Sequence, residues 1–289
     1  MIDHARWQTY LTSLAQKPTG SRGVCYLPEL ALLRFTGADT LTFLQGYLTS
    51  DAFELPEDRL SPTALCNLKG RVVANGWCNK HDNGVDLIVH RSLTQPLGKF
   101  LKNYLVFSKT ELTDCSDSHV VFGSINAGPS SGLHMGEEQR LIVVEELEIA
   151  TKLCESEESL APGDWASRLI RDEIALVSLP VSERFLPQML GLELTGAIDF
   201  AKGCYLGQEV VARAQHRGKV KRELARFSWQ GERPPAGTEF QTTDGLANGV
   251  VIQTDAAESG GYCLAVSSAA RAGLGSENSQ SATLFQSVQ

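Results

Sequence analysis

The chain has 289 residues, of which 42% are hydrophobic and 21% charged, proportions that are typical of a folded protein and argue against extensive disorder. Its formal net charge of −8 argues against a general binder of nucleic acid or anionic membranes, because such binders need a basic surface. Residues 1–17 lack the apolar core of a signal peptide, and no stretch approaches the roughly 18 apolar residues of a membrane span, so we expect a cytoplasmic protein.

The hydrophobic pattern of the first hundred residues predicts short helices and strands in alternation, joined by brief turns. Asp39 is a good N-cap, and the apolar residues that follow it recur at helical spacing. In chain order, the pattern predicts a helix over 3–16, a strand over 25–35, a helix of about two to three turns over 39–48, strands over 64–67, 72–78 and 85–90, and a helix over 93–104.

The predicted secondary structure changes in character near residues 216–222, from mixed helices and strands to short strands alone. Before this point the pattern predicts strands over 120–124 and 141–146, a Gly- and Ser-rich loop over 128–136 and a helix over 162–174. After it, short β-rich runs at 224–229, 238–241, 249–253 and 261–266 are separated by turn residues, and 273–289 is expected to be a loose last strand or tail. These features predict an α+β region followed by a small all-β module, most simply a barrel.

The seven cysteines are odd in number, widely spaced and without a C-x-x-C pair. We therefore expect reduced thiols, and neither a disulfide framework nor a zinc ribbon. The six histidines show no paired spacing, so we expect no metal site.

One segment combines a thiol, an ammonium group and turn-forming residues within a few positions. Two glycines four positions apart bracket a cysteine and a tyrosine, and the first is predicted to allow a positive φ or a close backbone approach. The polar pair that follows predicts the first turn of a helix, where the dipole favours a carboxylate. The members of this motif are Lys202, Gly203, Cys204, Tyr205, Gly207, Gln208 and Glu209.

Cys204 is the best candidate for a reactive cysteine in the chain. It lies close to the predicted helix N-terminus and two residues from the ammonium of Lys202, and both features favour the thiolate. The alternative is that Cys204 is a small buried hydrophobe, as free cysteines commonly are. The residues alone leave both interpretations open.

Positive charge gathers between Asp199 and Arg226, where seven Lys and Arg stand against three acidic residues. This segment is either a solvated linker between domains or a rim that receives an anion such as a carboxylate tail or a phosphate. The basic residues are Lys202, Arg213, Arg217, Lys219, Lys221, Arg222 and Arg226.

The letters KGCYxGQE, followed by Arg213 and Lys221-Arg222, resemble the signature of the YgfZ family of folate-binding proteins. Those proteins are relatives of the aminomethyltransferase (T-protein) of the glycine cleavage system. Further stretches agree with the family in order and spacing: TGAD, FLQG and LTSD within 36–51, LKGR and the strand through Asn75, YLVFSK at 104–109, and FLPQ at 185–188. The resemblance covers about residues 25–226.

The resemblance implies an α+β, aminomethyltransferase-like fold: two interleaved ferredoxin-like portions, roughly 1–115 and 116–218, surround a central folate cavity, and 219–289 form a C-terminal β-barrel. It also implies a tetrahydrofolate-binding accessory protein that supports assembly or repair of iron–sulfur enzymes and, through them, tRNA methylthiolation. The implied partners are folate and iron–sulfur client or assembly proteins, without direct nucleic-acid or membrane contact. We expect a monomer.

By position, the resemblance assigns the functional motif to Lys202 and Cys204 and places this segment at the edge of the folate cavity. Trp165 matches a tryptophan of the family that lines the pocket, where an indole supplies a flat wall for a pterin. The alternative for Trp165 is plain core packing. The cofactor-binding residues that the resemblance implies are Trp165, Leu30 (in place of a second pocket tryptophan), Asn75 and Arg213.

The chain departs from true T-proteins at two carboxylates. T-proteins place an aspartate beside the reacting folate nitrogen, whereas the matching strand here carries Asn75, whose amide cannot ionise to hold a proton or stabilise an iminium. A T-protein glutamate that holds the pterin falls near Arg171. The sequence therefore disfavours aminomethyl transfer and leaves open whether any reaction is turned over.

Two other functions remain open from the sequence. One is a folate-dependent one-carbon transferase, with Cys204 as nucleophile or Lys202 as iminium former. The other is a pure binding module in which the basic segment recruits a partner protein.

Overall fold

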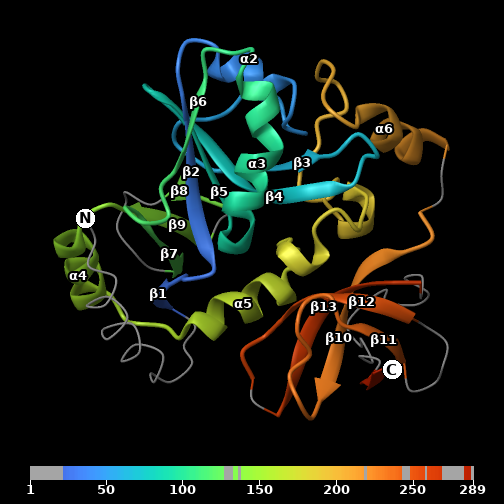
Figure 1. The fold of residues 1–289 in the computed structure, drawn as a ribbon. Coiled ribbons are helices and arrows are strands. Elements are labelled where there is room, and N and C mark those ends of the chain that lie inside the picture. Colours follow the sequence, from blue (N-terminus) through green and yellow to red (C-terminus); the bar gives the residue numbers. More distant parts are fainter. Residues whose placement is uncertain are drawn as a thin grey trace.

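The computed structural model describes residues 22–126, 133–135, 138–217, 220–242, 248–257, 259–268 and 283–287. The helix predicted over 3–16 lies outside these residues, as does most of the loop predicted over 128–136. Within them, helices and several antiparallel sheets confirm the α+β class (Figure 1).

The first sheet has five antiparallel strands in the order β3-β4-β5-β2-β6. Two helices, α2 and α3, cover one of its faces, because Leu97 and Leu101 of α3 share a hydrophobic cluster with Leu33 and Phe35. The elements are β2 (Leu30–Thr36), α2 (Thr40–Gln45), β3 (Ser61–Cys66), β4 (Val72–His81), β5 (Gly84–His90), α3 (Thr94–Leu105) and β6 (Glu111–Asp114).

The second sheet has four antiparallel strands in the order β1-β7-β9-β8. A hydrophobic cluster that contains Leu32, Ile88, Val121 and Leu141 fills the space between the two sheets. Helix α4 covers the outer face, where its Leu153 packs in the cluster of Phe122 and Ile142. The elements are β1 (Gly23–Tyr26), β7 (Val120–Ile125), β8 (Leu133–His134), β9 (Gln139–Val144), α4 (Leu147–Ser156) and α5 (Pro162–Arg171).

The strand predicted over 25–35 is in fact two strands in two different sheets. Strand β1 pairs with β7, and β2 pairs with β5 and β6. Between them the chain turns at residues 27–30, where the Leu30 amide donates to the Leu27 carbonyl at 3.1 Å. Pro28 cannot donate a backbone hydrogen bond, so a continuous central strand is disfavoured at this point.

The C-terminal strands form a five-stranded closed barrel in the order β10-β13-β12-β11-β14. The ring closes because β14 pairs with both β10 and β11. The barrel lies beneath α5 and the first sheet in Figure 1, and α6 (Gln208–Arg217) precedes it. Its strands are β10 (Glu223–Gln230), β11 (Glu239–Thr242), β12 (Asn248–Thr254), β13 (Gly260–Ser267) and β14 (Thr283–Ser287).

Helix α2 is shorter than the helix predicted over 39–48. The Asp39 carboxylate accepts the amide of Lys109 at 2.8 Å and makes no side-chain cap. The carbonyls of Gln45 and Leu48, at the C-terminal end of the predicted helix, accept hydrogen bonds from the Lys202 side chain. The other predicted helices and strands within the described residues are present, with bounds that differ by a few residues.

Candidate functional site

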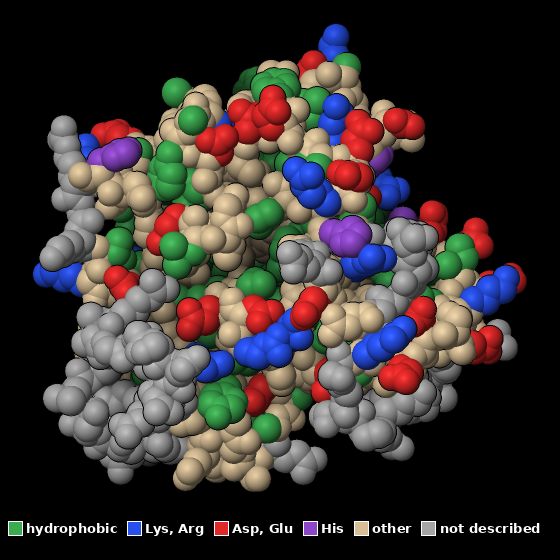
Figure 2. Space-filling model, turned by 180° about the vertical axis from the view of Figure 1, so that it is seen from behind, with side chains coloured by type: hydrophobic (Ala, Val, Ile, Leu, Met, Phe, Trp, Pro, Cys, Tyr) green, Lys and Arg blue, Asp and Glu red, His purple; other side chains and the backbone are tan. Residues whose placement is uncertain are grey.

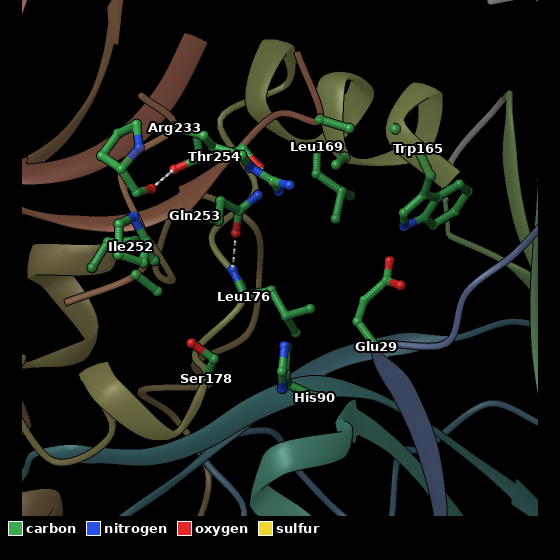
Figure 3. Close-up of a pocket in the computed structure, with 16 residues that line it drawn as sticks. Glu29, His90, Trp165, Leu169, Leu176, Ser178, Arg233, Ile252, Gln253 and Thr254 are labelled. Atoms are coloured by element: carbon green, nitrogen blue, oxygen red, sulfur yellow. Dashed lines mark hydrogen bonds between the residues drawn. The ribbon is translucent and has the colours of Figure 1, made fainter. Parts of the chain in front are cut away.

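A cavity of about 530 Å³ lies where α5, the barrel and the ends of the first sheet meet (Figure 3). This volume is within the range of small-molecule sites, which is roughly 300–1,000 Å³. Gly163 in the first turn of α5 lets the helix approach the barrel, since a Cβ at this position would lie 2.5 Å from the Cβ of Ala256. The described lining residues are Glu29, His90, Gly163, Trp165, Ala166, Leu169, Leu176, Ser178, Arg233, Pro234, Pro235, Ala236, Ile252, Gln253, Thr254 and Ala256.

Two buried polar atoms in the cavity wall have no hydrogen-bond partner among the described residues. They are the Nε1 atom of Trp165 and the hydroxyl oxygen of Ser178. Buried polar groups are nearly always paired, and leaving one unpaired costs about 1–3 kcal/mol. The cavity wall therefore holds two polar atoms whose hydrogen-bonding capacity the described residues leave unused.

Glu29 supplies the only carboxylate among the described residues of the lining. The turn between β1 and β2 carries it into the cavity, and Figure 3 shows the carboxylate directed toward Trp165. Burial raises the pKa of Glu29, while its own backbone amide and the nearby Arg91 guanidinium act in the opposite direction. Hydrogen-bond donors brought close to this carboxylate would favour its charged form.

His90 presents a donor to the same cavity. Its Nδ1 atom accepts the backbone N–H of Ser92 at 3.2 Å, so the neutral ring carries its proton on Nε2. Burial lowers the pKa of His90, and Arg91 lowers it further, so the ring is neutral near pH 7. In Figure 3 the ring points into the cavity.

Gln253 of β12 joins the barrel to the α+β part of the chain. Its Oε1 accepts the Leu176 amide at 2.7 Å, and its Nε2 donates to the Ile174 carbonyl at 3.2 Å. Because both ends of the amide are used, Gln253 holds the cavity wall together. The guanidinium of Arg233, which precedes β11, donates to the Thr254 carbonyl at 3.0 Å across the same wall.

Trp165 lines the cavity and also belongs to the core between the sheets. Its side chain is only 1% exposed, and a Cβ at Gly123 would lie 2.4 Å from the indole ring. One face of the indole therefore packs on Gly123, and the nitrogen-bearing edge is turned toward Glu29 in Figure 3. Leu30 lies in the same core cluster but is not among the described lining residues, and its neighbour Glu29 takes that place.

Asn75 and Arg213, also expected to bind the cofactor, lie outside the described lining. Asn75 is 5% exposed, and its side chain donates to the Ala175 carbonyl at 2.7 Å and accepts the Val177 amide at 2.8 Å. It thus fastens the segment after α5 to β4. Arg213 is exposed on α6 and pairs with Glu209 at 2.8 Å. Neither contact leaves the side chain placed for a ligand in this cavity.

Lys202 is 7% exposed, and its Nζ donates to the carbonyls of Gln45, Leu48 and Ser50 at 2.9, 2.7 and 2.8 Å. Burial lowers the pKa of Lys202 to about 8, although the carboxylates of Asp51 and Asp199 oppose this effect. All three N–H groups of an ammonium are used by these bonds. Lys202 therefore anchors its own segment to the loop after α2 and is not directed at the cavity or at Cys204.

Among the other motif residues, Gly203, Cys204 and Glu209 are exposed and only Tyr205 is buried. Tyr205 is buried with its ring 5.3 Å from the Lys202 Nζ, and burial raises the pKa of its phenol. Gly207 has φ +84 and a Cβ there would lie 2.4 Å from the Asn67 carbonyl oxygen, so this position requires glycine. Gly203 needs neither a positive φ nor a close approach, which corrects the expectation from the sequence.

Cys204 is exposed, whereas the other six cysteines of the chain are buried. It lies four positions before the first residue of α6 and is not among the described residues that line the cavity. The motif thus displays a thiol on the surface of an anchored loop. The expectation that the Lys–Gly–Cys segment stands at the edge of the Trp165 cavity does not agree with this arrangement.

The basic residues between 199 and 226 do not gather around the cavity either. None of those whose side chains the structure describes is among its lining residues, and Arg226 lies over the ring of Tyr262 at 5.5 Å. On the face seen in Figure 2, basic and acidic side chains are interspersed. Among the described residues, no helix is long and apolar enough to cross a membrane, and no three His, Cys, Asp or Glu side chains are placed to hold a metal ion.

Sequence reasoning missed Glu29, His90, Ser178 and Arg233. Arg171 stands where the T-protein pattern predicts a carboxylate; it pairs with Asp172 and lies outside the described lining. The carboxylate that does line the cavity belongs to Glu29. A signal was present for Glu29, because Pro28 inside an apolar stretch predicts a break at which a polar residue can turn into the interior. The other three residues carried no local signal.

Sequence comparison finds relatives of one family. The chain is 31% identical to the tRNA-modifying protein YgfZ of Cronobacter sakazakii over 72% of each chain, and 31% identical to that of Yersinia pseudotuberculosis over 78% of each. Among solved structures, the glycine cleavage system aminomethyltransferase T of Bartonella henselae matches with a TM-score of 0.64 and 14% identity, over 89% of this chain and 80% of the other. This last likeness shows the fold alone. No family model matches the chain.

Proposed function

Because the chain belongs to the YgfZ family of tRNA-modifying proteins, we propose that it is a tetrahydrofolate-binding accessory protein that supports iron–sulfur enzymes and, through them, tRNA methylthiolation. The observation that carries the proposal is the cavity beside Trp165, with its unpaired Nε1 and Ser178 hydroxyl.

The residues of the cavity fit a folate. A pterin has a flat apolar body with hydrogen-bond donors and acceptors around its edge, and the wall offers apolar surface from Leu169, Leu176 and Ile252. The Glu29 carboxylate can accept hydrogen bonds, and the N–H groups of Trp165 and His90 can donate them. These groups would hold and orient the ring, and the apolar wall would exclude water from it.

When bound, tetrahydrofolate supplies a carrier for one-carbon units. An aminomethyl transfer on it, the main alternative function, needs an ionisable group beside the reacting nitrogen. Asn75 cannot serve, because its amide is occupied by Ala175 and Val177 and it lies outside the described lining. The observations therefore favour binding over turnover.

Titration with tetrahydrofolate under anaerobic conditions is expected to give saturable binding and a change in tryptophan fluorescence. Trp165→Phe should keep the fold, lose most of the fluorescence change and weaken binding, since it removes the unpaired Nε1. Trp229→Phe is a matched control, because Trp229 is also buried but lies in the barrel, with its Nε1 near Asp255. Absence of binding at millimolar tetrahydrofolate would contradict the proposed function.

The iron–sulfur role is tested in a strain that lacks the gene, by measuring tRNA methylthiolation. The wild-type gene is expected to restore the activity, and Cys204→Ser is expected to fail to restore it while unfolding at the same temperature as wild type, because the exposed thiol makes no packing contribution. Ala201→Ser, an exposed change in the same loop, is the control. Full restoration by Cys204→Ser would show that the thiol is dispensable.

A further inference from the structure

The segment after α3 exposes two adjacent apolar side chains. Val106 is 70% exposed and Phe107 is 90% exposed. Both belong to the stretch YLVFSK at 104–109, to which the proposed function assigns no role. Clustered apolar side chains on a surface commonly mark a contact with another molecule. This surface is therefore a candidate for binding a partner.

A groove of about 520 Å³ lies beside these residues, between α3 and β6. Its described lining includes Gly98, Lys102 and Val106 on the helix side and Leu112 and Asp114 on the strand side. A Cβ at Gly98 would meet no atom within 4 Å, so the groove is open there. Figure 1 shows β6 at the rim of the first sheet, beside α3. The groove thus has space for side chains that come from outside the sheet.

Strand β6 is the last strand of its sheet, and its outer side is open. Among the described strands it pairs with β2 alone. The Cys115 amide donates to the Leu32 carbonyl at 2.9 Å, so the alternating antiparallel pattern directs the N–H and C=O groups of Leu112 and Asp114 away from β2. Open edges of this kind pair with extended chains. The side chains of the same two residues line the groove, so one extended segment can use both the edge and the groove.

The charges of β6 indicate which kind of segment fits. Glu111 and Asp114 are exposed, and the strand has no basic residue. Opposite charges stabilise cross-strand pairs, and like charges destabilise them. The β6 strand of a second copy would bring two more carboxylates to this edge, so self-pairing is disfavoured. A strand that carries Lys or Arg is favoured instead.

We propose that an extended, basic segment of another protein adds to the first sheet along β6 and places alternate apolar side chains in the groove beside Phe107. Backbone hydrogen bonds to Leu112 and Asp114 supply affinity, and the groove and the two carboxylates supply selectivity. The described lining of this groove shares no residue with that of the Trp165 cavity. The inference therefore goes beyond the proposed function and does not depend on folate binding.

Selection of a phage-displayed library of random dodecapeptides on the full chain tests this surface. Enriched peptides are expected to have apolar residues at alternating positions and an excess of Lys and Arg. Made synthetically, they should bind in fluorescence-anisotropy titrations. Phe107→Asp is expected to weaken binding about tenfold without changing the Tm, because the side chain is exposed. Glu111→Lys is expected to weaken binding about threefold to tenfold.

An N-methyl scan of one enriched peptide tests the strand pairing itself. Only every second residue of an added strand directs its N–H toward β6. Methylation of one amide at a time is therefore expected to abolish binding at alternate positions and to be tolerated at the positions between them. A scan without this alternation would overturn strand addition.

Phe53→Asp and Glu54→Lys are the matched controls, because both residues are exposed and lie outside the described lining of the groove. They should bind the peptides as wild type does. The inference is overturned if no peptide is enriched, or if the enriched peptides bind Phe107→Asp as tightly as wild type.

Two further measurements separate this inference from its alternatives. Dimerisation in sedimentation velocity that Phe107→Asp abolishes would assign the surface to a second copy and would also overturn the proposal. Tetrahydrofolate titration of Phe107→Asp should match wild type, since Phe107 lies outside the described lining of the Trp165 cavity. Failure of the wild-type chain to bind tetrahydrofolate would reject the proposed function and leave the peptide result standing.

Discussion

Lys202→Ala is expected to lower the free energy of unfolding by about 3–5 kcal/mol, because it leaves three carbonyls without the donors that now satisfy them. The loss should also loosen the loop after α2, which the same segment holds through the Leu206 amide to the Gly46 carbonyl at 2.9 Å. Urea unfolding followed by circular dichroism measures the effect as a lower midpoint with an unchanged slope.

Lys69→Ala is the matched control, since Lys69 is an exposed lysine in the turn between β3 and β4. It should change stability by no more than about 0.5 kcal/mol. If Lys202→Ala were as stable as this control, the three carbonyl contacts would contribute nothing, and a direct chemical role for the ammonium would return as the better explanation. Cys204→Ser should unfold like wild type. Comparing it with Lys202→Ala therefore distinguishes the structural role of the Lys202 ammonium from the role of the exposed Cys204 thiol.

Asn75→Asp is expected to lower stability at pH 7 by about 2–4 kcal/mol and to create no aminomethyl transfer. A carboxylate can still accept the Val177 amide, but it places a negative oxygen against the Ala175 carbonyl that Asn75 now satisfies as a donor. The variant tests why this chain carries an amide where T-proteins carry a carboxylate.

The pH dependence of this variant has a definite sign. The introduced carboxyl has a folded-state pKa above its unfolded value of about 3.9, because burial and the carbonyl disfavour its charged form. Its penalty is therefore small near pH 4, where the protonated group can donate to Ala175, and grows as the pH rises through the folded-state pKa. Urea unfolding at both pH values measures this change.

Asn103→Asp, an exposed change on α3, is the control and should have little effect at either pH. An Asn75→Asp variant as stable as wild type at pH 7 would mean that the amide is not required there. Turnover of a lipoyl-bound aminomethyl donor by the wild-type chain would contradict the argument that Asn75 prevents this chemistry.

The sequence predicted much of the local structure. Helix α3 follows from apolar residues at helical spacing and strand β5 from alternating ones, whereas β4 and β7 are strand-like stretches that the structure buries on both faces. The motif around Cys204 and its resemblance to the YgfZ family could also be read directly, and the comparisons show that family. Prediction was wrong where a single residue interrupts a pattern, as Pro28 does between β1 and β2.

The direction of side chains in an irregular segment could not be predicted. Lys202 and Cys204 are two positions apart and both polar enough to face water, yet the first is buried and the second exposed. Three carbonyls more than 150 residues earlier in the chain decide this difference, since they satisfy the ammonium inside the protein.

By itself, the sequence predicted most of the helices and strands, the family of the chain and the missing carboxylate at position 75, but it did not predict α4 or the division of residues 25–35 into β1 and β2. Only the tertiary structure decided that Glu29, His90, Trp165, Ser178 and Arg233 share one cavity and that the Cys204 loop lies apart from it. The reason is physical: a helix or strand depends on neighbours within a few residues, whereas a cavity depends on how surfaces from distant segments fail to fill the space between them.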